Sequence, residues 1–112
     1  MNDRFTVRWT QTAVDDLLSI IDYVADREGL EAAERLYGQI TRGVAGLQAM
    51  PSRCRVVPEL EGEGIAGYRE LLVGPYRLVF AVRGGEVILL TVVDGRRDLG
   101  ELLIGRALRE RD

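Results

Sequence analysis

Hydrophobic residues recur along this chain with two different periods, which separate helical segments from extended ones. Near the N-terminus they lie three or four positions apart, at Ala13, Leu17, Ile20, Ile21 and Val24. This is the spacing of one face of an α-helix. A second run with this spacing extends from about Leu30 to Met50, and Pro51 then prevents its continuation. Because only a short turn at Gly29 separates the two runs, they predict an antiparallel helix hairpin.

The remaining segments alternate in polarity or are rich in branched and aromatic residues, as β-strands are. One short strand precedes the helices and three follow them: Phe5–Trp9, Tyr68–Val73, Tyr76–Arg83 and Glu86–Val93. Glycine-containing pairs at 74–75 and 84–85 suit tight turns between the last three. We expect residues 51–67 to form a surface loop with a brief extended piece. The leucines after Asp98 predict a short final helix.

This order of elements, β-α-α-β-β-β(-α), predicts one α+β domain over residues 1–112. The apolar face of the helix hairpin would pack on one face of a largely antiparallel sheet. The first strand would join that sheet at an edge or beside the last strand.

Composition narrows the function classes. The formal net charge is −3 and the pI is about 5.0, which argues against a basic nucleic-acid binder that recognises DNA sequence by itself. The chain has no His and no Lys, so only carboxylates, tyrosines or Cys54 could transfer protons.

One cysteine excludes an internal disulfide, and neither a metal site nor a cofactor is indicated. Without an apolar leader or membrane-spanning run, we expect a cytoplasmic protein with no membrane partner.

Arginines are the candidate functional residues of the predicted sheet. Alternation along Tyr76–Arg83 places Arg77 opposite the bulky residues that should meet the hairpin, and so on an open face. Arg69 lies on the neighbouring strand, and Arg96 and Arg97 follow the last strand. Together they could bind an anion or an acidic partner. Alternatively, each arginine pairs with a nearby acid: Arg69 with Glu70 or Glu86, and Arg97 with Asp98 or Glu101.

Three segments of the chain carry a family resemblance: WTQTAVDDLLSIIDYVADREG, YRELLVGPYRLVFAV and EVILLTVVDGRRD. In this order they resemble the RelE/ParE superfamily of toxins from bacterial toxin–antitoxin pairs. The similarity extends from Val7 to Leu103. It implies a toxin of a type II toxin–antitoxin module that a cognate antitoxin neutralises.

The superfamily divides by activity. RelE-like members cleave messenger RNA on the ribosome with a cluster of Lys and Arg residues and a Tyr near the C-terminus. ParE-like members act against DNA gyrase. Here Glu70 and Leu72, or their neighbours, stand where the ribonuclease pattern has lysines, and no Tyr follows Arg97. The resemblance therefore favours a ParE-like inhibitor of gyrase that acts by protein contact and is not an enzyme.

The expected contacts follow from this interpretation. The predicted target-binding residues are Arg69, Arg77, Arg96, Arg97 and Asp98. The predicted antitoxin-binding residues are Leu17, Ile21, Tyr37 and Arg77. Two alternatives remain open: a RelE-like messenger-RNA endonuclease in which Arg69, Arg77 and Arg96 contact phosphate and the transition state, and an inactive member that only binds its antitoxin.

Overall fold

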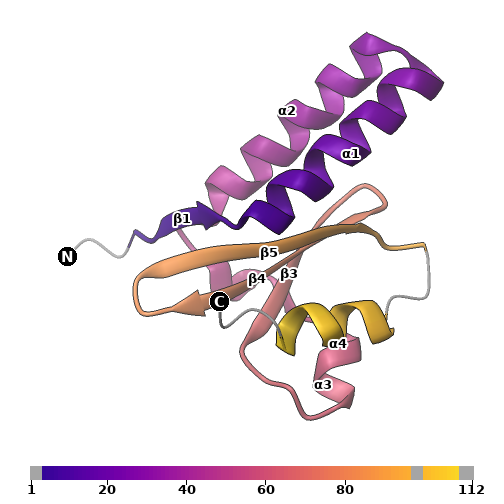
Figure 1. The fold of residues 1–112 in the computed structure, drawn as a ribbon. Helices are drawn as coiled ribbons and strands as arrows, with labels where there is room; N and C mark the ends of the chain where they lie inside the picture. Colours follow the sequence, from indigo (N-terminus) through magenta and orange to yellow (C-terminus); the bar gives the residue numbers. More distant parts are fainter. Residues whose placement is uncertain (1–3, 97–99, 109–112) are drawn as a thin grey trace.

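The predicted helix hairpin is present in the structure, a computed structural model that describes residues 4–96 and 100–108 apart from the side chains of residues 107 and 108. Helix α1 spans Gln11–Glu28 and helix α2 spans Leu30–Gly46. Thr10 caps α1, because its side-chain oxygen accepts a hydrogen bond from the Ala13 amide at 3.2 Å. Gly29 joins the helices at a φ of 100°, which favours glycine. The far end of the hairpin projects beyond the sheet (Figure 1).

The sheet has five strands in the order β1-β5-β4-β3-β2. Their bounds are Thr6–Trp9 for β1, Arg55–Val56 for β2, Tyr68–Val73 for β3, Tyr76–Arg83 for β4 and Glu86–Asp94 for β5. Strand β1 runs parallel to β5, and the other pairs are antiparallel. The first strand thus lies both at an edge and beside the last strand, as the sequence predicts.

Residues 51–67 are more ordered than the predicted surface loop. A 3₁₀ turn at Pro51–Arg53 leads into β2, and a short helix, α3, follows at Pro58–Gly62. Prolines stand in the first turn of both helical pieces, where a missing amide hydrogen costs no hydrogen bond. Leu60 of α3 is buried. The brief extended piece of the prediction is present as β2. The expectation of a surface loop for the rest was wrong, because apolar residues of this segment are buried in the core on that side of the sheet.

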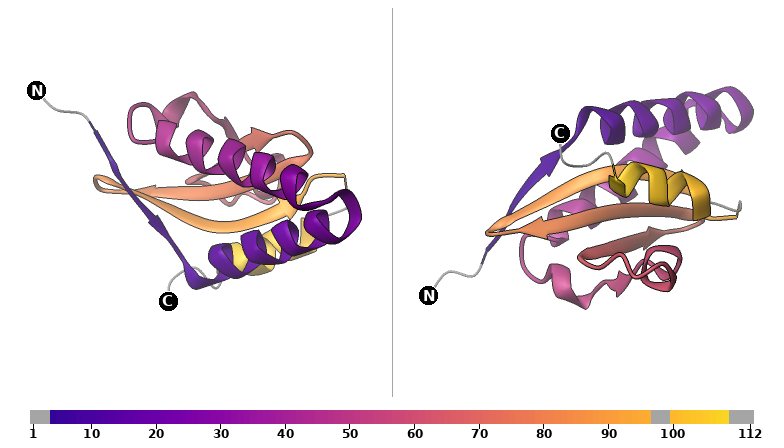
Figure 2. Two further views of the ribbon diagram at one scale, coloured as in Figure 1. Left: turned by 90° about the horizontal axis from the view of Figure 1, so that it is seen from above. Right: turned by 60° about the horizontal axis from the view of Figure 1, so that its bottom comes forward.

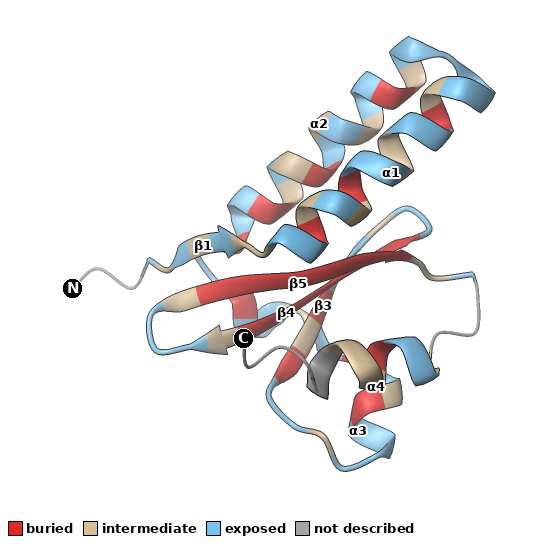
Figure 3. Cartoon of the chain, in the orientation of Figure 1, coloured by how far each residue is buried: buried red, intermediate tan, exposed pale blue. Residues whose placement is uncertain are grey.

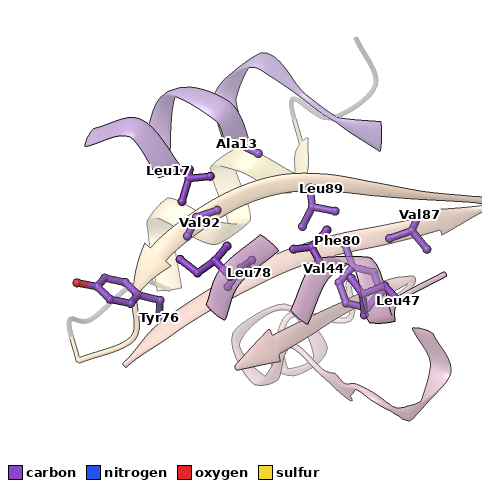
Figure 4. Close-up of a cluster of buried hydrophobic side chains, with 11 residues drawn as sticks. Ala13, Leu17, Val44, Leu47, Tyr76, Leu78, Phe80, Val87, Leu89 and Val92 are labelled. Atoms are coloured by element: carbon purple, nitrogen blue, oxygen red, sulfur yellow. The ribbon is translucent and has the colours of Figure 1, made fainter. Parts of the chain in front are cut away.

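Both faces of the sheet are covered. On one face, side chains of the hairpin pack against Tyr76, Leu78 and Phe80 of β4 (Figure 4). On the other face, α3 and the C-terminal helix α4 (Gly100–Leu108) lie against the sheet, on the side away from the hairpin (Figure 2). Leu60 and Leu103 supply the buried contacts there. The predicted open face is therefore absent.

Strands β4 and β5 form the centre of the domain and are buried along most of their length (Figure 3). Val79 pairs with Thr91 whereas Phe80 pairs with Leu89, so Leu90 is an extra residue in β5. Such a β-bulge changes the direction of the following side chains.

Within the described part of the chain, no helix has the length and apolar character that crossing a membrane requires.

Candidate functional site

Arg77 of β4 lies at the centre of a buried charge cluster. Only 7% of the residue is exposed. Its Nε donates to Oε1 of Glu70 at 2.7 Å, and its Nη1 and Nη2 donate to the two carboxylate oxygens of Glu59 at 2.7 and 2.5 Å. The second oxygen of Glu70 accepts from Nε of Arg55 at 2.5 Å. Two cations and two anions thus balance within this cluster, which we call the Arg77 cluster.

The Arg77 cluster joins four elements of the fold. Arg77 and Glu70 come from the adjacent strands β4 and β3, Arg55 from β2, and Glu59 from the short helix α3. Hydrogen bonds from Arg77 hold the pKa of Glu59 below its usual value, although burial acts in the opposite direction. The same bonds raise the pKa of Arg77. Each of the three guanidinium nitrogens of Arg77 therefore donates a hydrogen bond within the protein.

This geometry corrects the predicted arginine face. The expectation that Arg77 stands on an open face is wrong, because α3 covers it and carries its main partner. Arg69 pairs in register with Phe80, whereas Arg77 pairs with Leu72. Directly opposed residues share a face and successive residues alternate, so the two arginines lie on opposite faces. The structure does not bring these two guanidiniums together.

The alternative pairing with nearby acids also differs in detail. Arg69 donates from Nη1 to the backbone oxygen of Cys54 at 2.6 Å, and not to Glu70 or Glu86. Glu86 pairs instead with Arg8 of β1, with 3.3 Å between the Arg8 Nε and a carboxylate oxygen. The predicted target residues Arg97 and Asp98 lie outside the described residues.

Arg96 is exposed in the turn that follows β5, two residues beyond the last residue of that strand, Asp94. Its guanidinium donates to both carboxylate oxygens of Asp94, at 3.0 and 2.7 Å. The hydroxyl of Tyr76 points away from the apolar cluster at this end (Figure 4). Burial raises the pKa of Tyr76, and the negative charge of Asp94 raises it further. Arg96, Asp94 and Tyr76 therefore form a polar corner, which we call the β5 corner.

A second polar contact, which is partly buried, was not predicted from the sequence. One carboxylate oxygen of Asp16 in α1 accepts from the Thr91 hydroxyl at 2.5 Å, the Val92 amide at 3.1 Å and the Arg106 guanidinium at 2.9 Å. These bonds tie α1, β5 and α4 together. Thr91 and Arg106 lie 75 and 90 residues from Asp16 in sequence, so no local spacing could have revealed the contact.

The predicted antitoxin-binding residues have different environments. Leu17 is buried in the core between the hairpin and the sheet, and Ile21 is half-buried against that core. Tyr37 is 48% exposed on α2. Leu17 and Arg77 thus offer no surface to a partner in this conformation, because each is enclosed by other parts of the chain.

Few groups at these sites can transfer protons. Burial raises the pKa of the Cys54 thiol, an effect larger than the opposing one of Arg69, so the thiol is less reactive than an ordinary cysteine. Tyr76, with its raised pKa, is a poor base at neutral pH. Within residues 4–96 and 100–108, no three His, Cys, Asp or Glu residues are grouped so as to hold a metal ion.

Comparison with known families agrees with this architecture. The profile of the ParE toxin of type II toxin–antitoxin systems, parDE, matches residues 7–99. The chain belongs to the ParE toxin family. That match includes both helices of the hairpin and all of the sheet except Thr6, the first residue of β1, so it covers the Arg77 cluster and the β5 corner of this ParE-family toxin.

Solved structures place the ParE-family chain among toxin–antitoxin proteins. A chain of the chromosomal ParDE system from P. aeruginosa superposes with a TM-score of 0.69 and 26% identity, covering 82% of this chain and 97% of that one. A chain of the RelBE2 toxin–antitoxin complex from Mycobacterium tuberculosis has a TM-score of 0.55 and 23% identity, covering 81% and 91%. The second likeness concerns the fold alone. Curated protein sequences give no significant match.

Proposed function

We propose that this ParE-family toxin inhibits DNA gyrase in the cytoplasm by protein contact and does not cleave RNA. The observation that supports this most strongly is the state of Arg77. A guanidinium that stabilises a phosphorane-like transition state must reach the substrate with free donors. Arg77 is buried, and each of its three nitrogens donates to Glu59 or Glu70, which uses three of its five N–H donors.

The other arginines of the rival endonuclease do not form a common site with Arg77. Arg69 lies on the opposite face of the sheet and donates to a backbone carbonyl. Arg96 lies at the end of β5 and is held by Asp94. An RNA phosphate would have to meet arginines on two faces of a covered sheet, and the nearby proton-transfer candidates have raised pKa values. We therefore do not favour the RelE-like alternative.

The β5 corner is the surface that we assign to the target. Arg96 is exposed, and its two bonds to Asp94 fix the plane of the guanidinium. Asp94 takes up Nε and Nη2 of Arg96, so Nη1 is the nitrogen that we expect a carboxylate of a protein partner to contact. Arg97 and Asp98, which follow Arg96 directly in the sequence, remain predicted contributors to this surface.

A cognate antitoxin is the second partner in this proposal. The P. aeruginosa chain to which this one is similar comes from a chromosomal ParDE toxin–antitoxin system. The hairpin carries four of the large apolar side chains that remain exposed in the described part of the chain: Leu18, Tyr23, Leu30 and Tyr37. Exposed apolar groups gathered on one element are typical of a protein interaction site.

A supercoiling assay tests the proposed activity. Purified toxin is added to DNA gyrase, ATP and relaxed plasmid, with and without its cognate antitoxin. We expect the toxin to inhibit supercoiling and the antitoxin to restore it. Unimpaired supercoiling at toxin concentrations far above those of gyrase would refute the proposal, and absence of a growth defect on expression alone would favour the inactive alternative.

A further inference from the structure

Gly95 lies between the two ion-paired residues of the β5 corner, Asp94 and Arg96. Its amide donates to the carbonyl oxygen of Pro75 at 2.7 Å, which extends the pairing of β4 and β5 by one residue beyond Tyr76 and Asp94. The φ angle of Gly95 is not positive, so the backbone conformation does not require a glycine here. The reason for a glycine at this position lies in its surroundings.

The space beside Gly95 is occupied by the side chain of Arg77. Because Asp94 stands directly opposite Tyr76 and successive residues alternate between faces, Gly95 and Arg77 belong to the same face. A Cβ atom at position 95 would lie 2.7 Å from Cδ and 2.8 Å from Cγ of Arg77, and 3.0 Å from the Pro75 carbonyl oxygen. Carbon atoms attract one another at about 3.5–4.0 Å and repel at much shorter distances. Only glycine therefore fits without movement of the neighbouring atoms.

Arg77 is the less movable side of this contact. The Cβ atom would meet the aliphatic part of a side chain whose guanidinium is held by three hydrogen bonds to Glu59 and Glu70. The side chain of Arg77 is only 8% exposed, whereas that of Arg96 is 69% exposed. A side chain at position 95 would therefore displace the exposed turn and leave the buried arginine in place.

The direction of the Arg96 guanidinium depends on the backbone of this turn. Oδ1 of Asp94 accepts from the Arg96 amide at 2.9 Å and from its Nε at 3.0 Å, and Oδ2 accepts from Nη2 at 2.7 Å. These bonds connect residues 94 and 96, so their lengths and angles are set by the bend of the chain at Gly95. Because hydrogen bonds weaken steeply outside a narrow range of angles, displacement of Gly95 would release the guanidinium.

We infer that Gly95 is a positioning residue for the target-binding surface. Its lack of a side chain lets the turn after β5 lie against the aliphatic part of Arg77, and in this position Asp94 holds Arg96 in the orientation that the target recognises. The inference rests on the proposed function, in which Arg96 contacts gyrase. It gives buried Arg77 a part in target binding that involves no contact between Arg77 and the target.

A double-mutant cycle tests this role of Gly95. Toxins with Gly95→Ala, Arg96→Ala or both are compared in the gyrase supercoiling assay, after circular dichroism has shown that each is folded. Gly85→Ala is the matched control, because Gly85 also lies in a turn next to β5, has no positive φ, and offers open space to a Cβ atom. We expect Gly95→Ala to raise the toxin concentration needed for half inhibition by about tenfold or more, and the control to behave as wild type.

The double variant distinguishes positioning from an independent effect. If Gly95 acts through Arg96, the double variant should inhibit gyrase as well as Arg96→Ala alone, because the two losses are not additive. Wild-type inhibition by Gly95→Ala would overturn the inference. A double variant whose loss equals the product of the two single losses would also overturn it.

NMR of the free toxin provides a second test that does not involve gyrase. The signal of the Arg96 Nε–H group should shift in Gly95→Ala, because its bond to Asp94 is broken, and should stay in place in Gly85→Ala. An unchanged Arg96 signal in Gly95→Ala would refute the positioning role. Failure of the wild-type toxin to inhibit gyrase would instead refute the proposed function, so the two failures are distinct.

Discussion

The guanidinium of Arg77 and the carboxylate of Glu59 form a two-bond ion pair that links β4 to the short helix α3. Their positions are 18 residues apart in sequence. Because α3 has only five residues, it cannot be stable by itself. The pair, together with buried Leu60, explains why residues 58–62 form an ordered cover on the sheet.

Removal of the Glu59 charge should destabilise the domain. In Glu59→Gln, the amide group faces a guanidinium donor, so one hydrogen bond becomes a donor–donor contact. We expect the free energy of unfolding to fall by about 1–3 kcal/mol, measured by urea denaturation. Glu61→Gln on the same helix is the control, since Glu61 is exposed and forms no ion pair with any described residue. Similar losses in both variants would show that the Arg77 pair contributes nothing specific.

Acid should weaken the same pair. The pKa of Glu59 is lower in the folded protein than in the unfolded chain, so its contribution is fully present above about pH 4.3, the ordinary value for glutamate. That contribution is lost as pH falls through the folded pKa, because the unfolded chain binds the proton first. Urea unfolding between pH 7 and about pH 3.5 should show a smaller pH dependence for Glu59→Gln than for wild type. Parallel curves would argue against this linkage.

Asp16 should protect the open part of β5. Beyond Trp9, β1 no longer pairs with β5, and the Val92 amide donates to Asp16 instead of a strand. Asp16→Ala should lower the free energy of unfolding by about 2 kcal/mol and increase hydrogen exchange of the Val92 amide in NMR measurements. Asp15→Ala, which changes an exposed neighbour, should do neither. Unchanged Val92 exchange in Asp16→Ala would contradict this role.

The β5 corner gives a functional prediction. Arg96→Ala should leave the circular dichroism spectrum unchanged but raise the toxin concentration needed to inhibit gyrase by about tenfold or more, as loss of a charged contact at an interface does. Arg53→Ala removes an exposed arginine elsewhere on the surface. If both variants inhibit gyrase as well as wild type, the target surface lies elsewhere.

Local patterns were sufficient for much of the fold. Helical spacing from Ala13 to Val24 and alternation from Tyr76 to Arg83 predict the hairpin, the central strands and the face of the sheet that the hairpin covers. The burial of Arg77 could not be predicted in this way, because it depends on Glu59, which lies in a segment that lacks a clear period. Alternation shows which face a side chain occupies but not what covers that face.

The other differences between prediction and structure also arise from contacts between residues far apart in the sequence. Arg69 and Arg77 lie on paired strands, yet their register places them on opposite faces. Sequence alone specifies that register only through the turn at residues 74–75. The contact of Asp16 with Thr91 depends on the parallel strand, the bulge in β5 and the final helix. None of these three features can be predicted from the residues next to Asp16 in the sequence.

Analysis of messenger RNA on translating ribosomes tests the central claim most directly. Purified toxin is added to ribosomes stalled on a defined message, and new 5′ ends are mapped by primer extension, with gyrase supercoiling assayed from the same preparation. We predict an intact message, because Arg77 is buried and neutralised by Glu59 and Glu70. We also predict inhibited supercoiling, as the proposed function requires. Cleavage of the ribosome-bound message with unaffected supercoiling would contradict the account.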